Sequence, residues 1–352
     1  MTAKRIGVPL VAALVLGGCA SAGPAIVPAA APAVGDATGY RIVAPATVSD
    51  ATHAQMIGQL TRADVVFFGE QHDDPETHRA EFEVLEAIGR TGRPVVLSLE
   101  MFERDVQGVV DDYLAGRIDE KDFLARSRPW DRYATDYRRM VELAKARRWP
   151  VVAANVPRSL ASAVGRKGLA ALDTLTPRER TFAASENVCP KDDYRARFLE
   201  SMQSHSPGAP STAAATSPAA APGVAPGAAA PAMPSTPTTP AAPRAAAPSG
   251  GLPPAVAERF YVAQCVKDEA MAEAIVNARL AAPRNAIVVH YDGAFHSDYS
   301  QGTVSRVARR QPGWTLAVVT AIPVADPAAA PIAPQSGKAD FVIFTRRPER
   351  RP

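Results

Sequence analysis

Two histidines that follow glycines at the same spacing are the first candidates for chemistry in this sequence of 352 residues. They lie in the segments Gly69-Glu70-Gln71-His72 and Gly293-Ala294-Phe295-His296. A glycine lets the chain turn sharply, and imidazoles beside carboxylates suit Mn, Co or Zn ions. A glutamate near a metal-bound water can act as a general base. One hypothesis is therefore a metal-dependent hydrolase with Glu70 as its catalytic base and with the metal ligands Glu70, His72, Glu100 and His296.

A tyrosine three residues beyond the second histidine supports a different hypothesis. Tyr299 ends the segment His296-Ser297-Asp298-Tyr299, and a tyrosinate can bind haem iron. We expect His296 to lie close enough to accept the phenol proton and keep the oxygen charged. The alternative is an ordinary half-buried tyrosine, and the spacing alone leaves both open.

The remaining histidines carry simpler expectations. His78 falls on a predicted helix and is expected to face solvent. His53 and His205 lie in weakly patterned segments and are expected at the surface. His290 lies inside a predicted strand, which is typical of a hydrogen-bonded core histidine.

Six apolar runs rich in β-branched residues predict the strands that position these residues. The expected strands are 64–68, 94–99, 150–154, 286–290, 316–322 and 341–344. Helical spacing of apolar residues over 76–90, 104–115, 137–148 and 254–281 separates most of them. We therefore predict an α/β fold with a mostly parallel β-sheet flanked by helices. The consecutive helices of 158–281 predict a helical subdomain inserted between the third and fourth of these strands.

The ends of these strands carry polar residues that are far apart in the sequence. In an open parallel sheet the carboxyl ends lie along one edge, and ligands bind in the crevice there. The polar residues at or just after these ends include Glu70, His72, Glu100, Asn155, Asp292 and His296. We expect their side chains to converge at that edge.

The N-terminal segment resembles the export signal of bacterial lipoproteins. Lys4 and Arg5 precede an apolar run over 6–16, which closes on Leu16-Gly17-Gly18-Cys19. We expect a signal peptide over 1–18, a lipid on Cys19 and a flexible tether over 19–39. The alanine after the cysteine favours the periplasmic face of the outer membrane, and an ordinary signal peptide is the alternative.

Composition divides the rest of the chain. The Ala/Pro-rich segment 206–250 cannot bury enough apolar surface to order itself, so it is expected to be disordered. It separates a first core part over 40–205 from a second over 251–345. The second part holds an Ala/Pro-rich loop at 324–337, expected to lie outside the packed structure, and a basic tail follows over 346–352.

Cysteine content and net charge add two further expectations. Cys189 and Cys265 flank the insertion, and in an oxidising compartment such a pair usually forms a disulfide; two separate buried thiols are the alternative. The chain has 39 basic and 36 acidic residues, a net charge of +3. This bias is too weak to indicate a nucleic-acid partner.

Five motifs in order resemble those of the ChaN-like haem-binding lipoproteins of the Tiki superfamily. They are VFFGEQHDDP at 66–75, SLEMFERD at 98–105, AANVPR at 153–158, QCVKDEAMA at 264–272 and DGAFHSDY at 292–299. The resemblance implies a lipid-anchored protein of iron or haem uptake that forms a homodimer with its haems face to face. The implied haem-binding residues are Tyr299, His296, His72, Glu70, Glu100, Asn155 and Arg158.

The same resemblance keeps the hydrolase as the alternative. Related Tiki proteins are metal-dependent proteases with two G-x-x-H turns and a glutamate, which implies a divalent ion instead of haem. The family's usual Gly-Asn-Gly-His is Gly293-Ala294-Phe295-His296 in this chain. The substitution predicts a bulky aromatic ring at the mouth of the pocket.

Overall fold

The computed structural model describes residues 39–204 and 252–347 of the chain. The expected signal peptide, Cys19, the insertion at 206–250, nearly all of the tether and most of the basic tail lie outside these residues.

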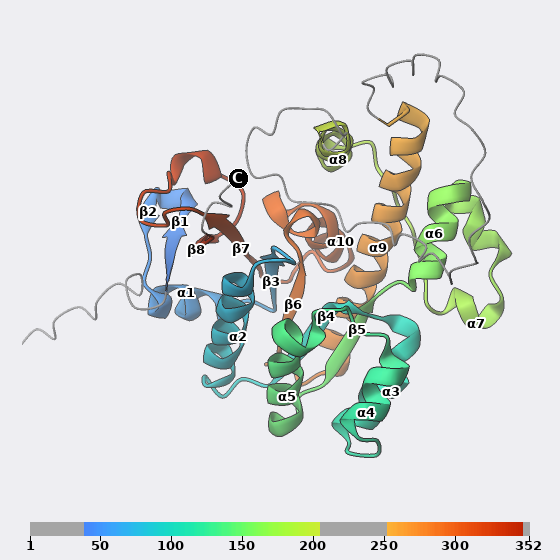
Figure 1. Ribbon diagram of the computed structural model, residues 1–352, viewed down its shortest axis with the longest axis horizontal. Coiled ribbons are helices and arrows are strands. Elements are labelled where there is room, and N and C mark those ends of the chain that lie inside the picture. The colour runs from blue at the N-terminus through green and yellow to red at the C-terminus, as the bar shows by residue number, and fades with distance from the viewer. Residues whose placement is uncertain (1–38, 205–251, 348–352) are drawn as a thin grey trace, which may run out of the picture. The chain divides into compact units, whose positions relative to one another are not determined.

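Eight strands of the described chain form one sheet in the order β2-β1-β8-β7-β3-β6-β4-β5 (Figure 1). Their bounds are β1 Tyr40–Ala44, β2 Ser49–Asp50, β3 Val65–Glu70, β4 Val95–Glu103, β5 Val151–Asn155, β6 Ile287–Gly293, β7 Leu316–Val324 and β8 Phe341–Arg346. The strands β3 to β8 pair in parallel, whereas β1 and β2 pair antiparallel at one edge. The six predicted strands and the mostly parallel sheet are thus confirmed, and the antiparallel edge is an addition.

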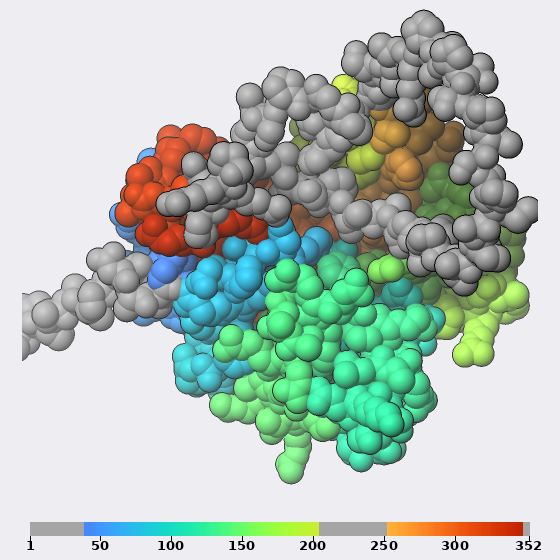
Figure 2. Space-filling model, viewed as in Figure 1, coloured from blue at the N-terminus to red at the C-terminus, as the bar shows by residue number. Residues whose placement is uncertain are grey.

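Helices surround this sheet, and four of them agree with the predicted segments 76–90, 104–115, 137–148 and 254–281. They are α1 His53–Leu60, α2 Pro75–Gly89, α3 Gln107–Leu114, α4 Glu120–Ser127, α5 Arg138–Arg147, α6 Arg158–Lys167, α7 Pro177–Arg180, α8 Asp193–Ser204, α9 Pro254–Ala281 and α10 Gly302–Arg310. Helices α2 to α5 make up the blue-to-green part of the surface in Figure 2. None of the helices in the described part of the chain is long and apolar enough to cross a membrane.

The alternation of side chains along β3 shows how both faces of the sheet become buried. Val66 and Phe68 point to one face and pack with residues of α2 and α5 such as Leu85 and Met140. Val65 and Phe67 point to the other face, where α9 and α10 cover them. Because both faces are covered, the central strands are apolar almost throughout, and polar residues are left to their ends.

Helices α6 to α9 follow β5, and no strand occurs among the described residues before β6. The C-terminal half of α9 covers the sheet, where Ile275 packs against Val288. The N-terminal part of α9 packs against α6 through Val266 and Val164. The long helix α9 therefore joins the sheet layer to the helices around it.

The Ala/Pro-rich loop at 324–337 was expected to lie outside the packed structure, and this expectation is wrong. Ala330 is buried and packs with Val43, Val342 and Phe344 on the sheet. The guanidinium of Arg41 donates to three carbonyl oxygens of the loop. These bonds tie a segment with few large side chains to the antiparallel edge.

Candidate functional site

The carboxyl ends of β3, β6, β4 and β5 lie next to one another, as the strand order requires. In the register of β3 and β6, Gly69 lies opposite Asp292 and Glu70 opposite Gly293. The predicted convergence of the strand-end residues is confirmed by the contacts given below. Glu70, Glu100, Asp292 and His296 are at most 5% exposed, so this edge is a buried polar cluster.

The two glycines of the G-x-x-H turns allow the turns to touch. A Cβ atom on Gly69 would lie 2.8 Å from the Cα atom of Ala294. A Cβ atom on Gly293 would lie 2.8 Å from Nε2 of His72. Each turn therefore needs glycine because the other turn occupies the space of a side chain.

His296 lies between two carboxylates. Its Nδ1 is 2.7 Å from Oδ1 of Asp268, and its Nε2 is 3.5 Å from Oε1 of Glu100. Burial alone would lower the pKa of His296, but the charges of Glu100 and Asp268 outweigh it and raise the pKa to about 10. His296 is therefore an imidazolium at neutral pH, and it holds the pKa of Glu100 far below its usual range despite burial.

Asp268 is a member of the site that the sequence analysis did not assign. It is fully buried on α9 and also accepts from Thr303 at 3.0 Å, with Arg306 Nη1 3.8 Å away. Gln264, one helical turn earlier, contacts the ring of His296 at 3.1 Å. An Asp on the buried face of an apolar helix, four residues from a Gln, was the available signal.

His72 and Glu70 form the second half of the cluster. Nδ1 of His72 lies 2.5 Å from Oε1 of Glu70, and the same oxygen accepts from the hydroxyl of Tyr137 at 2.6 Å. Burial would lower the pKa of His72, but Glu70 and Glu100 raise it above its usual value. The His72 side chain is 29% exposed, so it is the part of this cluster that solvent reaches.

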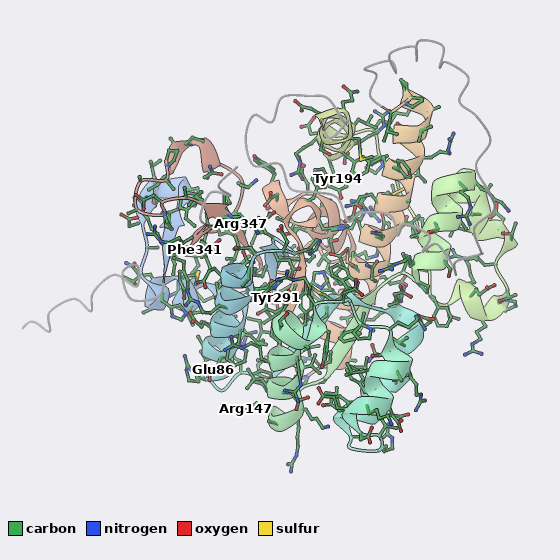
Figure 3. All side chains as sticks on the ribbon, in the orientation of Figure 1. Glu86, Arg147, Tyr194, Tyr291, Phe341 and Arg347 are labelled. Carbon is green, nitrogen blue, oxygen red and sulfur yellow. A yellow bond between two sulfur atoms is a disulfide. The ribbon has the colours of Figure 1, made fainter. Side chains whose placement is uncertain are left out.

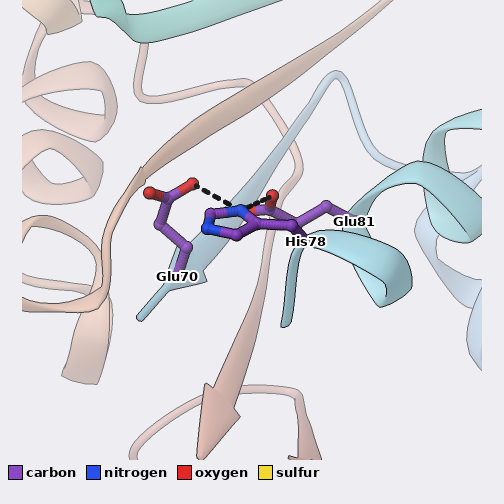
Figure 4. A group of neighbouring side chains, drawn as sticks. All are labelled: Glu70, His78 and Glu81. Atoms are coloured by element: carbon purple, nitrogen blue, oxygen red, sulfur yellow. Dashed lines mark hydrogen bonds and ion pairs between the residues drawn. The ribbon is translucent and has the colours of Figure 1, made fainter. Parts of the chain in front are cut away.

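His78 was expected to face solvent, and this expectation is wrong: only 3% of it is exposed. The π-helical turn Tyr133–Tyr137 covers it, because Asp136 lies 3.3 Å from its Nε2 and the ring of Tyr137 lies 5.0 Å from its own. On its other side, Nδ1 is 2.9 Å from Glu81 (Figure 4). Burial and the charge of Glu70 raise the pKa of Glu81 well above its usual value.

The interior of β6 matches the expectation for a core histidine. His290 is fully buried and its Nδ1 is 2.9 Å from the hydroxyl of Ser98. Burial lowers its pKa to about 3, so the ring is neutral. Tyr291, labelled near the centre of Figure 3, points to the opposite face and donates to the carbonyl oxygen of Glu81. This bond ties β6 to α2 beneath the cluster.

Tyr299 lies outside the buried cluster and is 40% exposed. Its backbone has φ +63°, and Ser300 beside it has φ +54°, two left-handed residues in succession. The ring lies 4.9 Å from the guanidinium of Arg197 and 5.1 Å from Nζ of Lys338. Both ring nitrogens of His296 face other groups, namely Gln264, Asp268 and Glu100. No hydrogen bond joins His296 to Tyr299 in the described part of the chain, so His296 is not placed to accept the phenol proton.

Phe295 was expected at the mouth of the pocket, but it is half-buried against α8. Its ring packs with those of Tyr194 and Phe198, at 5.4 and 5.8 Å between ring centres. The guanidinium of Arg197 lies 4.3 Å from the same ring. The aromatic residue in the second turn thus anchors α8, the helix that carries Arg197 to Tyr299.

Asn155 and Arg158 follow β5 at the opposite side of the edge. Asn155 is buried and its amide is 3.5 Å from Glu100. Arg158 is exposed and lines a cavity of about 660 Å³ together with Trp130, whose ring contacts His72 at 4.9 Å. Four strand spacings, roughly 20 Å, separate β5 from β7, beside which Tyr299 lies. The structure therefore does not bring Arg158 and Tyr299 together.

Comparisons with known proteins agree with this fold. The family model described as "Haem-binding uptake, Tiki superfamily, ChaN" matches residues 56–307, which is more than half of the chain. The chain belongs to this family. No match to a curated protein was found. The solved structure titled "Cofacial heme binding to ChaN of Campylobacter jejuni" is similar with a TM-score of 0.55 and 13% identity over 86% of this chain and 96% of that chain, which shows the same fold.

This member of the ChaN family has the predicted disulfide in a position that bears on the site. Cys189 and Cys265 are bonded, with their Cα atoms 5.7 Å apart. Cys265 follows Gln264, the residue in contact with His296, and Cys189 precedes α8. The disulfide therefore attaches the helix that carries Arg197 to the helix that carries Asp268.

Proposed function

We propose that this chain binds haem for uptake at the exposed face around Tyr299, whose phenol oxygen holds the iron. The observation that carries the proposal is the conformation of this tyrosine. Non-glycine residues with positive φ cost about 1–3 kcal/mol each and cluster at ligand sites. Here two occur in succession, and the amide of Tyr299 is held by the carbonyl oxygen of Lys338 at 2.7 Å. The strained turn presents a large aromatic residue to solvent.

The residues around Tyr299 fit a haem group. Haem is an apolar disc with two carboxylates, and its ferric iron accepts an anionic oxygen, as tyrosinate provides in catalase. Arg197 and Lys338 place two cations beside the ring, where they would attract the carboxylates. Arg197 is itself held in place by Gln301 and by the carbonyl oxygens of Phe295 and Asp298.

The finer parts of the proposal rest on the sequence and on the family. A lipid on Cys19 would attach the protein to the periplasmic face of the outer membrane. The helices of 158–281 would form an inserted helical subdomain that carries Arg197 against the site. The exposure of Tyr299 supports a homodimer in which two bound haems meet. In this proposal His296 is a buried positioning group, and haem contacts its neighbours rather than its ring.

Titration of the purified protein with hemin tests the proposal. Tyr299→Phe keeps the ring and removes the oxygen, so we expect the tyrosinate-to-iron charge-transfer band to disappear while the melting temperature stays nearly unchanged. Tyr133→Phe is the matched control, because its hydroxyl is buried without a hydrogen-bond partner in the described structure. An unaltered hemin spectrum in Tyr299→Phe would refute Tyr299 as the ligand.

A further inference from the structure

Three buried side chains outside the Tyr299 face direct their ligand atoms at one another. They are Glu70 at the end of β3 with His78 and Glu81 on α2, and Figure 4 shows them together. One atom from each lies within 4.8 Å of the other two. Their exposed fractions are 2%, 3% and 0%, so all three are shielded from bulk solvent.

The hydrogen bonds of His78 fix its tautomer. Its Nε2 lies 3.2 Å from the carbonyl oxygen of His72 and 3.3 Å from the carboxylate of Asp136. Both partners accept hydrogen bonds, which places a proton on Nε2. In the neutral ring Nδ1 then presents a lone pair, and it faces carboxylate oxygens of Glu81 at 2.9 Å and Glu70 at 3.9 Å. Lone pairs at these distances repel one another unless a proton or a metal ion lies among them.

Two carboxylate oxygens are also left over. Oε2 of Glu70 and Oε1 of Glu81 are buried and have no hydrogen-bond partner in the part of the chain that the structure describes. An unpaired buried carboxylate oxygen is costly, and buried charges are normally paired or coordinate metals. Arg132 contacts the nearby Asp136 at 2.5 Å, on the outer side of the group.

We propose that Glu70, His78 and Glu81 bind a divalent transition-metal ion. One imidazole and two carboxylates form a ligand set suited to Zn²⁺ or Mn²⁺. Ligand atoms bound at about 2.1 Å to one ion lie up to ~4.2 Å apart, so small side-chain shifts bring these atoms onto an ion. Asp136 and the His72 carbonyl then orient the imidazole, as acceptors behind metal-binding histidines do.

A cavity on the surface of α2 reaches one of the three residues. A cavity of about 450 Å³ is lined by His78 and Asp136, with Pro75, Arg132 and Thr135 among its other residues. His78 is thus the member of the proposed site that an ion in this cavity would meet first. The proposed site shares Glu70 with the metal set expected from the sequence, but it uses neither His72 nor His296 as a ligand.

Zinc titration of the full chain after chelator treatment tests the proposal. We expect one tightly bound Zn²⁺ per chain and a higher melting temperature with zinc. Glu81→Gln should weaken binding by at least about tenfold, and Asp136→Asn by roughly 10–100-fold. Glu86→Gln is the matched control on the same helix, at the side of the molecule in Figure 3, and should bind like the original protein.

X-ray absorption at the zinc edge of the unaltered protein gives a second measurement that needs no variant. The proposal requires one imidazole ligand, whereas the set Glu70, His72, Glu100 and His296 requires two. His296→Gln should accordingly keep its zinc affinity. The proposal would be overturned by two imidazole ligands at the zinc edge, by the absence of tight zinc binding, or by full zinc affinity in Glu81→Gln. Either of the last two results would mean that a shared proton, and not a metal ion, lies among Glu70, His78 and Glu81. The hemin titration is independent of all these outcomes.

Discussion

Replacement of Asp268 by asparagine should change how the stability of the protein depends on pH. The pKa of His296 is about 10 in the folded protein, whereas an unfolded histidine titrates near ~6.5. Because the folded pKa is the higher one, the stabilisation is complete below the unfolded value and is lost as the pH rises through the folded value. The whole shift corresponds to about 5 kcal/mol at roughly 1.4 kcal/mol per pKa unit.

The change of the free energy of unfolding with pH can be measured between pH 7 and pH 9. Between pH 7 and pH 9 the His296 contribution to the free energy of unfolding should fall by about 2–3 kcal/mol. His72, whose pKa is also raised, changes in the same direction. In Asp268→Asn only Glu100 still attracts the imidazolium, so the decrease should be roughly half as large. At pH 7 the variant should be less stable by about 3–5 kcal/mol, because a buried ion pair has lost one partner.

Urea denaturation followed by tryptophan fluorescence at pH 7, 8 and 9 gives the required free energies. Asp173→Asn, an exposed carboxylate removed from the cluster, should keep the slope of the unaltered protein. Equal slopes in the unaltered protein and in Asp268→Asn would refute the conclusion that Asp268 holds His296 in its charged form.

Three further changes test the glycine turns, the disulfide and the anchor. Gly69→Ala should destabilise the protein by roughly 1–3 kcal/mol because its Cβ would lie 2.8 Å from backbone. Gly58→Ala on α1 should stabilise it by about 0.5–1 kcal/mol, because a Cβ there meets nothing within 4 Å. Equal melting temperatures of the two variants would contradict this. Loss of the bond between Cys189 and Cys265, 76 residues apart, should cost about 4–5 kcal/mol by loop entropy, and equal urea midpoints with and without reductant would show otherwise. Cys19→Ala should move the protein into the soluble periplasmic fraction, and retention in salt-washed membranes would reveal another anchor.

The six parallel strands and the edge that carries the site could be predicted because their signals are local. A continuous apolar run such as Ile287–Val289 predicts a strand wherever it packs. The two strands at the antiparallel edge were not predicted, because they are short and β2 is exposed. The pairing of β1 with β8 depends on a segment about 300 residues away.

The members of the site that were missed share a different cause. Asp268, Glu81 and Asp136 are charged residues whose burial depends on the helices that pack over them. The amphipathic spacing of a helix assigns such residues to solvent, as it did with His78. It carries no information on segments that pack over the helix from elsewhere in the chain, such as the turn Tyr133–Tyr137 that covers α2. Tyr299 was a candidate from sequence, but the cations beside it, Arg197 and Lys338, come from α8 and from the loop before β8.

The buried acidic and basic side chains form one row in which the two kinds alternate, from the end of β3 to α9 and α10. Neighbours along the row are in contact or interact electrostatically, and its members are Glu70, His72, Glu100, His296, Asp268, Arg306 and Glu269. Removal of any inner member leaves two like charges facing each other or a buried charge without its partner. Substitutions within the row should therefore not be additive, whereas those at Tyr299, outside it, should add to each of them. This separation follows from the fold, since the row is buried between the strand ends and the helices α9 and α10, whereas Tyr299 is 40% exposed.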